Sequence, residues 1–269
     1  MIWLGCSGWN YKEWFGVFYP SYIRDQLRYY SQMFNSVEIN STFYGNPEKE
    51  IVQSWCKKVG DRKDFRFSIK MPGSITHDLF FSDRKSCVNK AVDFERQILG
   101  EMDSAGKLGA CLIQMSSRLS MNYWDDFTDF LGNLDSSGYK YFVELRNSDM
   151  ELRSASETLG NMGIGTVSTD TPVANLSSLE VGTKYIRLHG RNVAQWESKD
   201  EGMSKYKYLY NMDEIRELSA TIKKSVSTGD DIFIYFNNHH EGNAPMNAIS
   251  LGMELGLRIG KGQDQKKLF

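Results

Sequence analysis

The stretch Val37-Glu38-Ile39-Asn40-Ser41-Thr42-Phe43-Tyr44 begins as an apolar strand and turns polar on alternate positions as it ends. Side chains two positions apart share a face of a strand, so Glu38 and Asn40 point one way while Val37 and Ile39 point the other. The same layout recurs at other apolar runs, in the pairs Ser68/Lys70, Gln114/Ser116, Glu144/Arg146, Ser168/Asp170, Arg187/His189 and Tyr235/Asn237. Polar pairs at successive strand ends indicate a parallel barrel with its active site at the carboxyl ends of its strands.

Working outward from this stretch, we find eight apolar runs that alternate with segments of helical periodicity. The pattern predicts a single TIM-type (β/α)8 barrel domain of parallel strands over residues 1–269, with a polar C-terminal tail at about 260–269. The expected strands are 2–6, a run from residue 37, 65–70, 110–115, 140–145, 165–169, 184–188 and 231–236. The expected helices are 24–34, 48–59, 85–101, 123–134 and 154–162, and a long irregular segment covers 191 to about 210.

Composition excludes several classes of protein. The 269 residues are 41% hydrophobic and 25% charged, which is typical of a globular chain and unlike a disordered one. No apolar run approaches the roughly 18 residues of a membrane helix, and residues 1–6 do not resemble a signal peptide. A net charge of -2 provides no global basic surface, so nucleic acid is not favoured as a partner. We therefore expect a cytoplasmic protein that does not bind a membrane.

The four cysteines, Cys6, Cys56, Cys87 and Cys111, show no C-x-x-C spacing. This spacing argues against a zinc ribbon or a thioredoxin-type motif and fits reduced, buried thiols in a cytosol. The chain also lacks a glycine-rich phosphate loop, a G-x-S-x-G elbow and a dinucleotide fingerprint. Serine hydrolases and NAD enzymes are therefore poor matches.

The chain resembles the family called domain of unknown function 72, or YecE-like, nearly from end to end. The resemblance depends on Gly5-Cys6-Ser7-Gly8-Trp9, the Val37 to Tyr44 stretch, Lys70 with Thr76-His77, Val143-Glu144-Leu145-Arg146, Asp170-Thr171-Pro172, Tyr185 to Gly190, and Tyr235-Phe236-Asn237-Asn238. Two departures lie just beyond strand ends: Met115-Ser116-Ser117 replaces the usual Leu-Pro-Pro, and Met150 replaces a usual Trp. The resemblance implies a TIM-type barrel and no assigned reaction.

Projecting the strand ends into one barrel mouth predicts a polar site. The candidate catalytic residues are Glu38, Lys70, Glu144 and His189, because carboxylates, an amine and an imidazole in a desolvated mouth can share acid and base work. The candidate substrate-binding residues are Trp9, Tyr11, Asn40, Gln114, Arg146, Asp170, Arg187, Asn237 and Asn238. The competing interpretation is a set of buried ion pairs, for instance Glu144 with Arg146 or Arg187, that serve structure alone.

These residues favour an enzyme acting by acid/base chemistry on a small anionic (phosphate- or carboxylate-bearing) or sugar-like substrate, with the reaction class left open. The only cofactor they indicate is a divalent metal ion, held by Glu144, Asp170 and His189. The positive charges of Arg146 and Arg187 argue against it, because they would repel a metal cation. The alternatives are a metal-dependent phosphodiesterase, nuclease or sugar isomerase, and a non-catalytic ligand-binding protein. Substrate identity, reaction type and oligomeric state are beyond the sequence.

Overall fold

The computed structural model describes the chain except residues 147–151, 175, 177–183, 194–206, 226–229 and 261–269. The predicted tail from residue 261, the Met150 departure and residues 194–206 of the long irregular segment lie outside the described residues. The described strands are β1 (Ile2–Cys6), β2 (Ser36–Ile39), β3 (Arg66–Lys70), β4 (Leu108–Gln114), β5 (Tyr141–Glu144), β6 (Gly165–Asp170), β7 (Tyr185–Leu188) and β8 (Ile232–Phe236).

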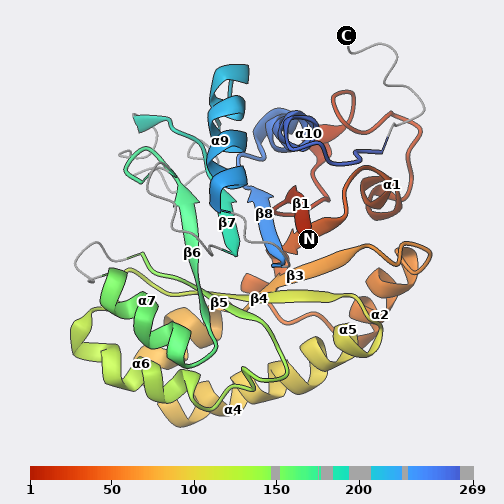
Figure 1. The fold of residues 1–269 in the computed structure, drawn as a ribbon. Helices are drawn as coiled ribbons and strands as arrows, with labels where there is room; N and C mark the ends of the chain where they lie inside the picture. The colour runs from red at the N-terminus through yellow and green to blue at the C-terminus, as the bar shows by residue number, and fades with distance from the viewer. Residues whose placement is uncertain (147–151, 175, 177–183, 194–206, 226–229, 261–269) are drawn as a thin grey trace. The chain divides into compact units, whose positions relative to one another are not determined.

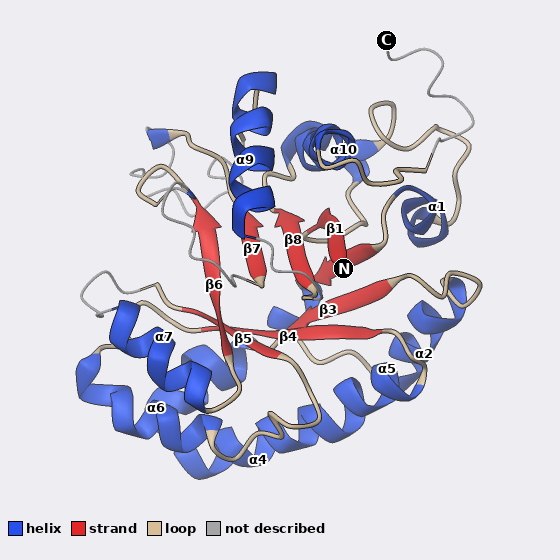
Figure 2. Cartoon of the chain, in the orientation of Figure 1, coloured by secondary structure: helices blue, strands red, loops and turns tan. Residues whose placement is uncertain are grey.

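The strands follow the hydrogen-bonded order β1-β8-β7-β6-β5-β4-β3-β2, and a parallel bridge from Ser7 to Glu38 links the end of β1 to β2. From β2 to β8 the strand order in the sheet is the order along the chain, and β1 pairs with β8. Described helices lie between successive strands from β1 to β6 and between β7 and β8 (Figures 1 and 2). The predicted parallel (β/α)8 fold class is confirmed. β2, β5, β7 and β8 are buried along their whole length, and the charged side chains of the first three, Glu38, Glu144 and Arg187, are therefore buried as well.

Helices separate the strands, and several begin at a side chain that caps them. The α-helices are α1 (Gln26–Met33), α2 (Lys49–Lys58), α3 (Phe80–Ser82), α4 (Arg84–Phe94), α5 (Gly100–Ser104), α6 (Trp124–Leu131), α7 (Leu152–Asn161), α9 (Met212–Ser225) and α10 (Asn243–Glu254). Asp25 and Asp83 accept the backbone N–H groups of Arg28 and Ser86, which accounts for the starts of α1 and α4. The predicted helix 85–101 is interrupted by a π-helical turn, η4 (Glu95–Leu99).

The described residues also contain the short helical turns η1 (Lys12–Trp14), η2 (Ser41–Phe43), the π-helical η3 (Ser74–Leu79), η5 (Met121–Tyr123) and η8 (His240–Gly242). Of these, η2 follows β2 and η3 follows β3, beside the strand ends at which the sequence predicts site residues. They therefore determine how the side chains beyond these two strands are presented.

The chain forms two compact units. The first contains residues 1–38 and 168–269, and the second contains residues 39–167. In the first unit, α10 packs on β1, β8 and α9, and the core contains Trp14, Tyr30, Tyr185 and Tyr235. In the second unit, the helices α2, α4, α5 and α6 lie on one side of β3, β4 and β5 (Figure 2). Whether the whole chain is one domain stays a prediction.

One glycine of the first unit permits a close approach between strands. A Cβ atom on Gly5 would lie 1.9 Å from the backbone oxygen of Ser36 and 2.6 Å from the hydroxyl of Tyr30. That hydroxyl accepts the N–H of Cys6 at 2.6 Å and donates to the Ser36 oxygen at 3.1 Å. Tyr30 of α1 thus ties β1 to β2, and any side chain at position 5 would displace it.

Candidate functional site

In the second unit, three of the predicted site residues share one face of the sheet. Lys70 is in register with Leu112, and Gln114 is in register with Glu144. Registered residues of parallel strands project to the same side, and Leu112 and Gln114 are two positions apart on β4. Lys70, Gln114 and Glu144 therefore project from one face, and each is less than a tenth exposed.

Glu144 is held by two donors from its own unit. Its Oε1 atom accepts Nε2 of Gln114 at 2.5 Å and Nε of Arg146 at 3.1 Å. The side chain of Glu144 is 5% exposed, whereas that of Arg146 is 42% exposed. The carboxylate is therefore buried, and its arginine partner extends to solvent.

Lys70 lies on an aromatic ring supplied by the stretch that follows β2. Its Nζ atom is 3.6 Å from the ring centroid of Phe43, a cation–π contact, and the Phe43 ring meets the His77 ring edge to face at 4.9 Å. The hydroxyl of Thr42 donates to the backbone oxygen of Lys70 at 2.6 Å. Asn40, also in this unit, immediately precedes η2 and is partly buried.

His77 lies among positive charges. Burial lowers the pKa of its imidazole to about 4, and the charges of Lys70 and Arg146 add to that effect. Arg118, which is exposed, also lowers this pKa and donates to the backbone oxygen of His77, while Asp78 acts in the opposite direction. Nδ1 of His77 lies 2.8 Å from the Thr76 hydroxyl. Three cations and a neutral imidazole thus gather around the ends of β3 and β5.

In the first unit, Glu38 is fully buried and carries a dense set of donors. Arg187 donates through Nη2 to Oε1 at 2.9 Å and through Nε to Oε2 at 3.0 Å. The hydroxyls of Tyr185 and Ser7 donate to Oε2 and Oε1 at 2.7 and 2.6 Å. A bidentate arginine together with two hydroxyl donors keeps this carboxylate satisfied without a ligand.

His189 follows Arg187 on the same face of β7 and is buried. Its Nε2 atom lies 3.5 Å from Nη1 of Arg187, and its Nδ1 atom lies 3.1 Å from Nδ2 of Asn237, at the end of β8. Arg187 thus contacts two of the predicted catalytic residues, Glu38 and His189. These residues form the interior polar network of the first unit.

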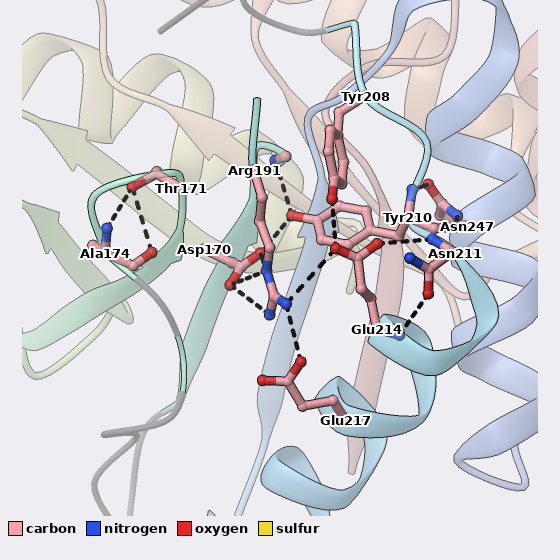
Figure 3. A network of polar contacts seen from close by, with 11 residues as sticks. Asp170, Thr171, Ala174, Arg191, Tyr208, Tyr210, Asn211, Glu214, Glu217 and Asn247 are labelled. Atoms are coloured by element: carbon pink, nitrogen blue, oxygen red, sulfur yellow. Dashed lines mark hydrogen bonds and ion pairs between the residues drawn. The ribbon is translucent and has the colours of Figure 1, made fainter. Parts of the chain in front are cut away.

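Asp170 belongs to another network of the first unit (Figure 3). Nε of Arg191 and the hydroxyl of Tyr210 donate to Oδ2 of Asp170 at 2.9 and 2.7 Å. Arg191 also pairs with Glu217 at 3.0 Å. Burial lowers the pKa of the Arg191 guanidinium, but its hydrogen bonds to Asp170 and Glu217 raise that pKa by more, so Arg191 stays charged.

Asn238 helps to hold the segment that contains Tyr208 and Tyr210. Its Nδ2 atom donates to the backbone oxygen of Tyr208 at 2.8 Å and to Oδ1 of Asn247 at 2.9 Å. Asn247 in turn accepts the N–H of Tyr210 and donates to its backbone oxygen. Asn238, just after β8, thus connects this segment to Asn247 of α10.

The aromatic residues after β1 are mostly packed. Tyr11 stacks on His239 with ring centroids 4.6 Å apart and donates its hydroxyl to the Ser7 oxygen at 2.7 Å. Trp9 is partly buried, and its backbone oxygen accepts the Tyr19 hydroxyl at 2.6 Å. Burial raises the pKa of the Cys6 thiol far above its ordinary value, so this thiol is no nucleophile at neutral pH.

The three residues predicted to hold a metal are divided between the two units, and their metal binding stays a prediction. Glu144 belongs to the second unit and Asp170 and His189 to the first, so neither unit assembles the three, and each carboxylate already accepts an arginine. In the part of the chain that the structure describes, no group of three His, Cys, Asp or Glu side chains is placed to bind a metal ion. We therefore derive no chemistry through a metal.

Phe43 and Arg118 contact His77, and neither is among the site residues predicted from the sequence. Phe43 is an aromatic residue just beyond the end of β2, in the Val37 to Tyr44 stretch. This position could have identified it as a site residue. Arg118 had no such signal, because it reaches His77 from a different strand connection.

The fold and these polar networks define an α/β barrel protein with charged side chains at the ends of its parallel strands. The family model described as "Protein of unknown function DUF72" matches residues 3–267, and the chain belongs to this family. The resemblance read from the sequence motifs is thus confirmed. No helix in the described part of the chain has both the length and the apolar character needed to cross a lipid bilayer.

Relatives of known sequence share this classification. The UPF0759 protein YecE of Escherichia coli K12 is 27% identical over 165 residues, which are 61% of this chain and 55% of that protein, so the match spans about half of the relative. The UPF0759 protein YunF of Bacillus subtilis is 23% identical over 92% of each chain. These names assign no reaction.

Solved structures of the same family confirm the fold. A DUF72 family protein from Thermotoga maritima superposes with a TM-score of 0.77 and 28% identity, over 95% of this chain and 99% of that one. A DUF72 family protein from Enterococcus faecalis gives the same TM-score at 21% identity, over 98% and 99% of the two chains.

Proposed function

We propose that this protein is an enzyme that performs acid/base chemistry on a small anionic substrate, one that carries a phosphate or a carboxylate. The proposed site lies in the second unit and comprises Lys70, His77, Glu144 and Arg146, with Gln114 orienting the carboxylate. Sugar-like groups can form part of such a substrate, because sugars commonly carry either anion.

The observation that carries this proposal is the excess of positive charge around His77. Lys70, Arg146 and Arg118 all act on this imidazole, and Asp78 is the single opposing carboxylate among the groups that shift its pKa. Cations gathered at a partly buried site favour an anion, and a guanidinium fork suits phosphate and carboxylate groups in particular.

The roles follow from the contacts. Glu144 is the group that takes and returns a proton, since its carboxylate is buried and held by Gln114 and Arg146. Lys70 binds the anion or stabilises charge that develops on the substrate, because its amine is held on the Phe43 ring at the same face. Neutral His77 supplies a hydrogen bond to the substrate.

Glu38 and His189 are left out of the proposed catalytic set. Both oxygens of Glu38 already accept hydrogen bonds from Arg187, Tyr185 and Ser7. Truncating one partner of such a buried pair perturbs folding, which would obscure any catalytic effect. We assign these two residues to the structural network of the first unit.

We also infer that the protein works in the cytoplasm. All four cysteines are buried as free thiols, a state that a reducing compartment maintains.

The test is binding of simple anions measured by thermal unfolding, because a ligand of the native state raises the midpoint temperature. We expect inorganic phosphate or acetate to raise the midpoint of the wild-type protein and to lose this effect in Lys70→Met and Arg146→Met. Lys90→Met is the matched control, since Lys90 is exposed on α4, and it should respond like wild type. Equal midpoint shifts in all four proteins, or none with any anion, would overturn the proposal.

Catalysis is separated from binding by Glu144→Gln, which keeps the shape of the side chain and removes its base. Retained anion binding with lost turnover of a substrate found in an activity screen supports the proposed reaction. Unchanged turnover excludes Glu144 as the base. A midpoint increase with Mn²⁺, Mg²⁺ or Zn²⁺ that Glu144→Gln abolishes would instead support the metal-dependent class.

A further inference from the structure

Tyr44 is the most exposed large apolar side chain of the described residues. It is 88% exposed, and it ends the stretch that begins with β2. An aromatic side chain left in water has a large apolar area available for binding, which makes it a candidate contact surface. The residues beside it indicate what it would contact.

The position of Tyr44 is well defined by its neighbours. Its ring meets the Phe43 ring at right angles with centroids 5.4 Å apart, and its N–H donates to the Ser41 oxygen at 3.1 Å. Phe43 in turn packs so closely on Gly73 that a Cβ atom there would lie 2.9 Å from the Phe43 ring. The backbone of Tyr44 and the Phe43 ring beside it are therefore held in place, while the Tyr44 ring itself is exposed to solvent.

The Tyr44 ring and the Lys70 ammonium of the proposed site contact the same ring, that of Phe43. The same Phe43 ring carries the Lys70 ammonium at 3.6 Å and contacts His77 at 4.9 Å. An anion bound by Lys70 would thus lie beside the ring that Tyr44 also contacts, and a larger ligand could extend from there to the Tyr44 ring.

We propose that Tyr44 is the binding surface for a ring in the substrate, and that the substrate is a ring-bearing anion. This inference rests on the proposed function, which it deepens by naming the substrate class. A flat base and the apolar face of a pyranose both stack on a tyrosine ring, so a nucleoside monophosphate and a hexose phosphate share the required chemistry.

The experiment compares ringless with ring-bearing anions by titration calorimetry. The probes are inorganic phosphate and acetate on one side, and a hexose phosphate, a hexuronate and a nucleoside monophosphate on the other. We expect Tyr44→Ala to weaken at least one ring-bearing anion by about three- to ten-fold, the size of one stacking contact. Binding of the ringless anions should not change, and Tyr44→Phe should bind all probes like wild type.

Tyr22→Ala is the matched control, because Tyr22 is also exposed but belongs to the first unit. The ring-bearing probe that Tyr44→Ala weakens most distinguishes a nucleotide base from a sugar. Unchanged affinity of Tyr44→Ala for every ring-bearing anion overturns this inference while leaving the proposed function in place. Failure of all five anions to bind the wild-type protein overturns the proposed function, and this inference with it.

Discussion

His77 connects the electrostatics of the candidate site to a measurable property. Its imidazole is half-buried against Phe43 and surrounded by Lys70, Arg146 and Arg118. Both burial and like charge disfavour the protonated ring, so the pKa is lowered from 6.5 to about 4 in the folded protein. His77 is therefore neutral over the physiological range and can accept or donate a hydrogen bond to an anionic ligand.

This lowered pKa predicts a loss of stability at mildly acidic pH. Above pH 6.5 the imidazole is neutral in both the folded and the unfolded chain, so it does not change the pH dependence of the free energy of unfolding there. Between about 6.5 and 4 the unfolded chain binds a proton at His77 that the folded chain does not, and the free energy of unfolding falls as pH falls. Urea unfolding at pH 7 and pH 5 should show a smaller decrease for His77→Gln than for wild type, and equal decreases would contradict the assignment.

The residues of the second-unit site could be partly predicted from the sequence. Lys70, Gln114 and Glu144 were predicted because alternation along a strand is a local property, readable from each run alone. The contribution of Phe43 could not be read in this way. Its ring meets Lys70 and His77 only because the connection after β2 packs on Gly73 of the connection after β3.

The pair of Glu38 and Arg187 joins two strands of the first unit that do not neighbour each other in the sheet. Glu38 lies in β2 and Arg187 in β7, with β1 and β8 between them where the Ser7–Glu38 bridge links β1 to β2. Both side chains are almost completely inaccessible to water. Each buried charge is tolerated only because the other compensates it. A buried charge without its partner lowers the free energy of unfolding.

Breaking this pair from one side should therefore destabilise the protein strongly. We expect Arg187→Leu to lower the free energy of unfolding by about 3 to 5 kcal/mol, because it leaves Glu38 buried without its cation. The double variant Glu38→Leu/Arg187→Leu should recover part of that loss. Arg216→Leu, which removes an exposed pair with Asp213, should change stability by less than about 1 kcal/mol in the same urea titration. A double variant less stable than Arg187→Leu would show that the pair is not coupled in this way.

The long helices α9 and α10 were not predicted from the sequence. In α9 the residues Ile215, Leu218 and Ile222 are buried at helical spacing, so the signal was present and could have been recognised. In α10 the periodicity is weak, because small and apolar residues are buried around much of the helix and Pro245 stands in its first turn. Packing on β1, β8 and α9 explains why that helix needs no single apolar stripe.

All four cysteine thiols lie in the interior of one unit or the other. Cys6 lies in the first unit and the other three cysteines in the second, and all four are buried. Burial raises the pKa of Cys56 and of Cys87 to about 11 and raises those of Cys6 and Cys111 well above the ordinary value. Since the thiolate is the reactive species, none of these residues presents a nucleophile to solvent.

The native protein should therefore resist thiol reagents until it unfolds. In denaturant we expect all four thiols to react, one equivalent of reagent each. In the native protein at pH 7.5 we expect them to react only as slowly as local unfolding exposes them. A chromogenic disulfide reagent measures both. Rapid stoichiometric labelling of any one cysteine in the native protein would contradict its burial.

The local pattern of the chain was enough to establish the fold class and the family. Eight apolar runs with alternating polar ends and intervening helical periods specify parallel strands and their connections, because each element's periodicity is written in its own residues. The motifs at the strand ends similarly identified the family whose model matches residues 3–267.

The pairing of the charges was decided only in the tertiary structure. Glu144 pairs with Arg146, and Arg187 pairs with Glu38, 149 positions away along the chain. An ion pair depends on which strand ends approach within a few ångströms, and local periodicity carries no information about that distance. For the same reason, the separation of the predicted residues into a cationic cluster around His77 and satisfied networks around Glu38 and Asp170 required the folded chain.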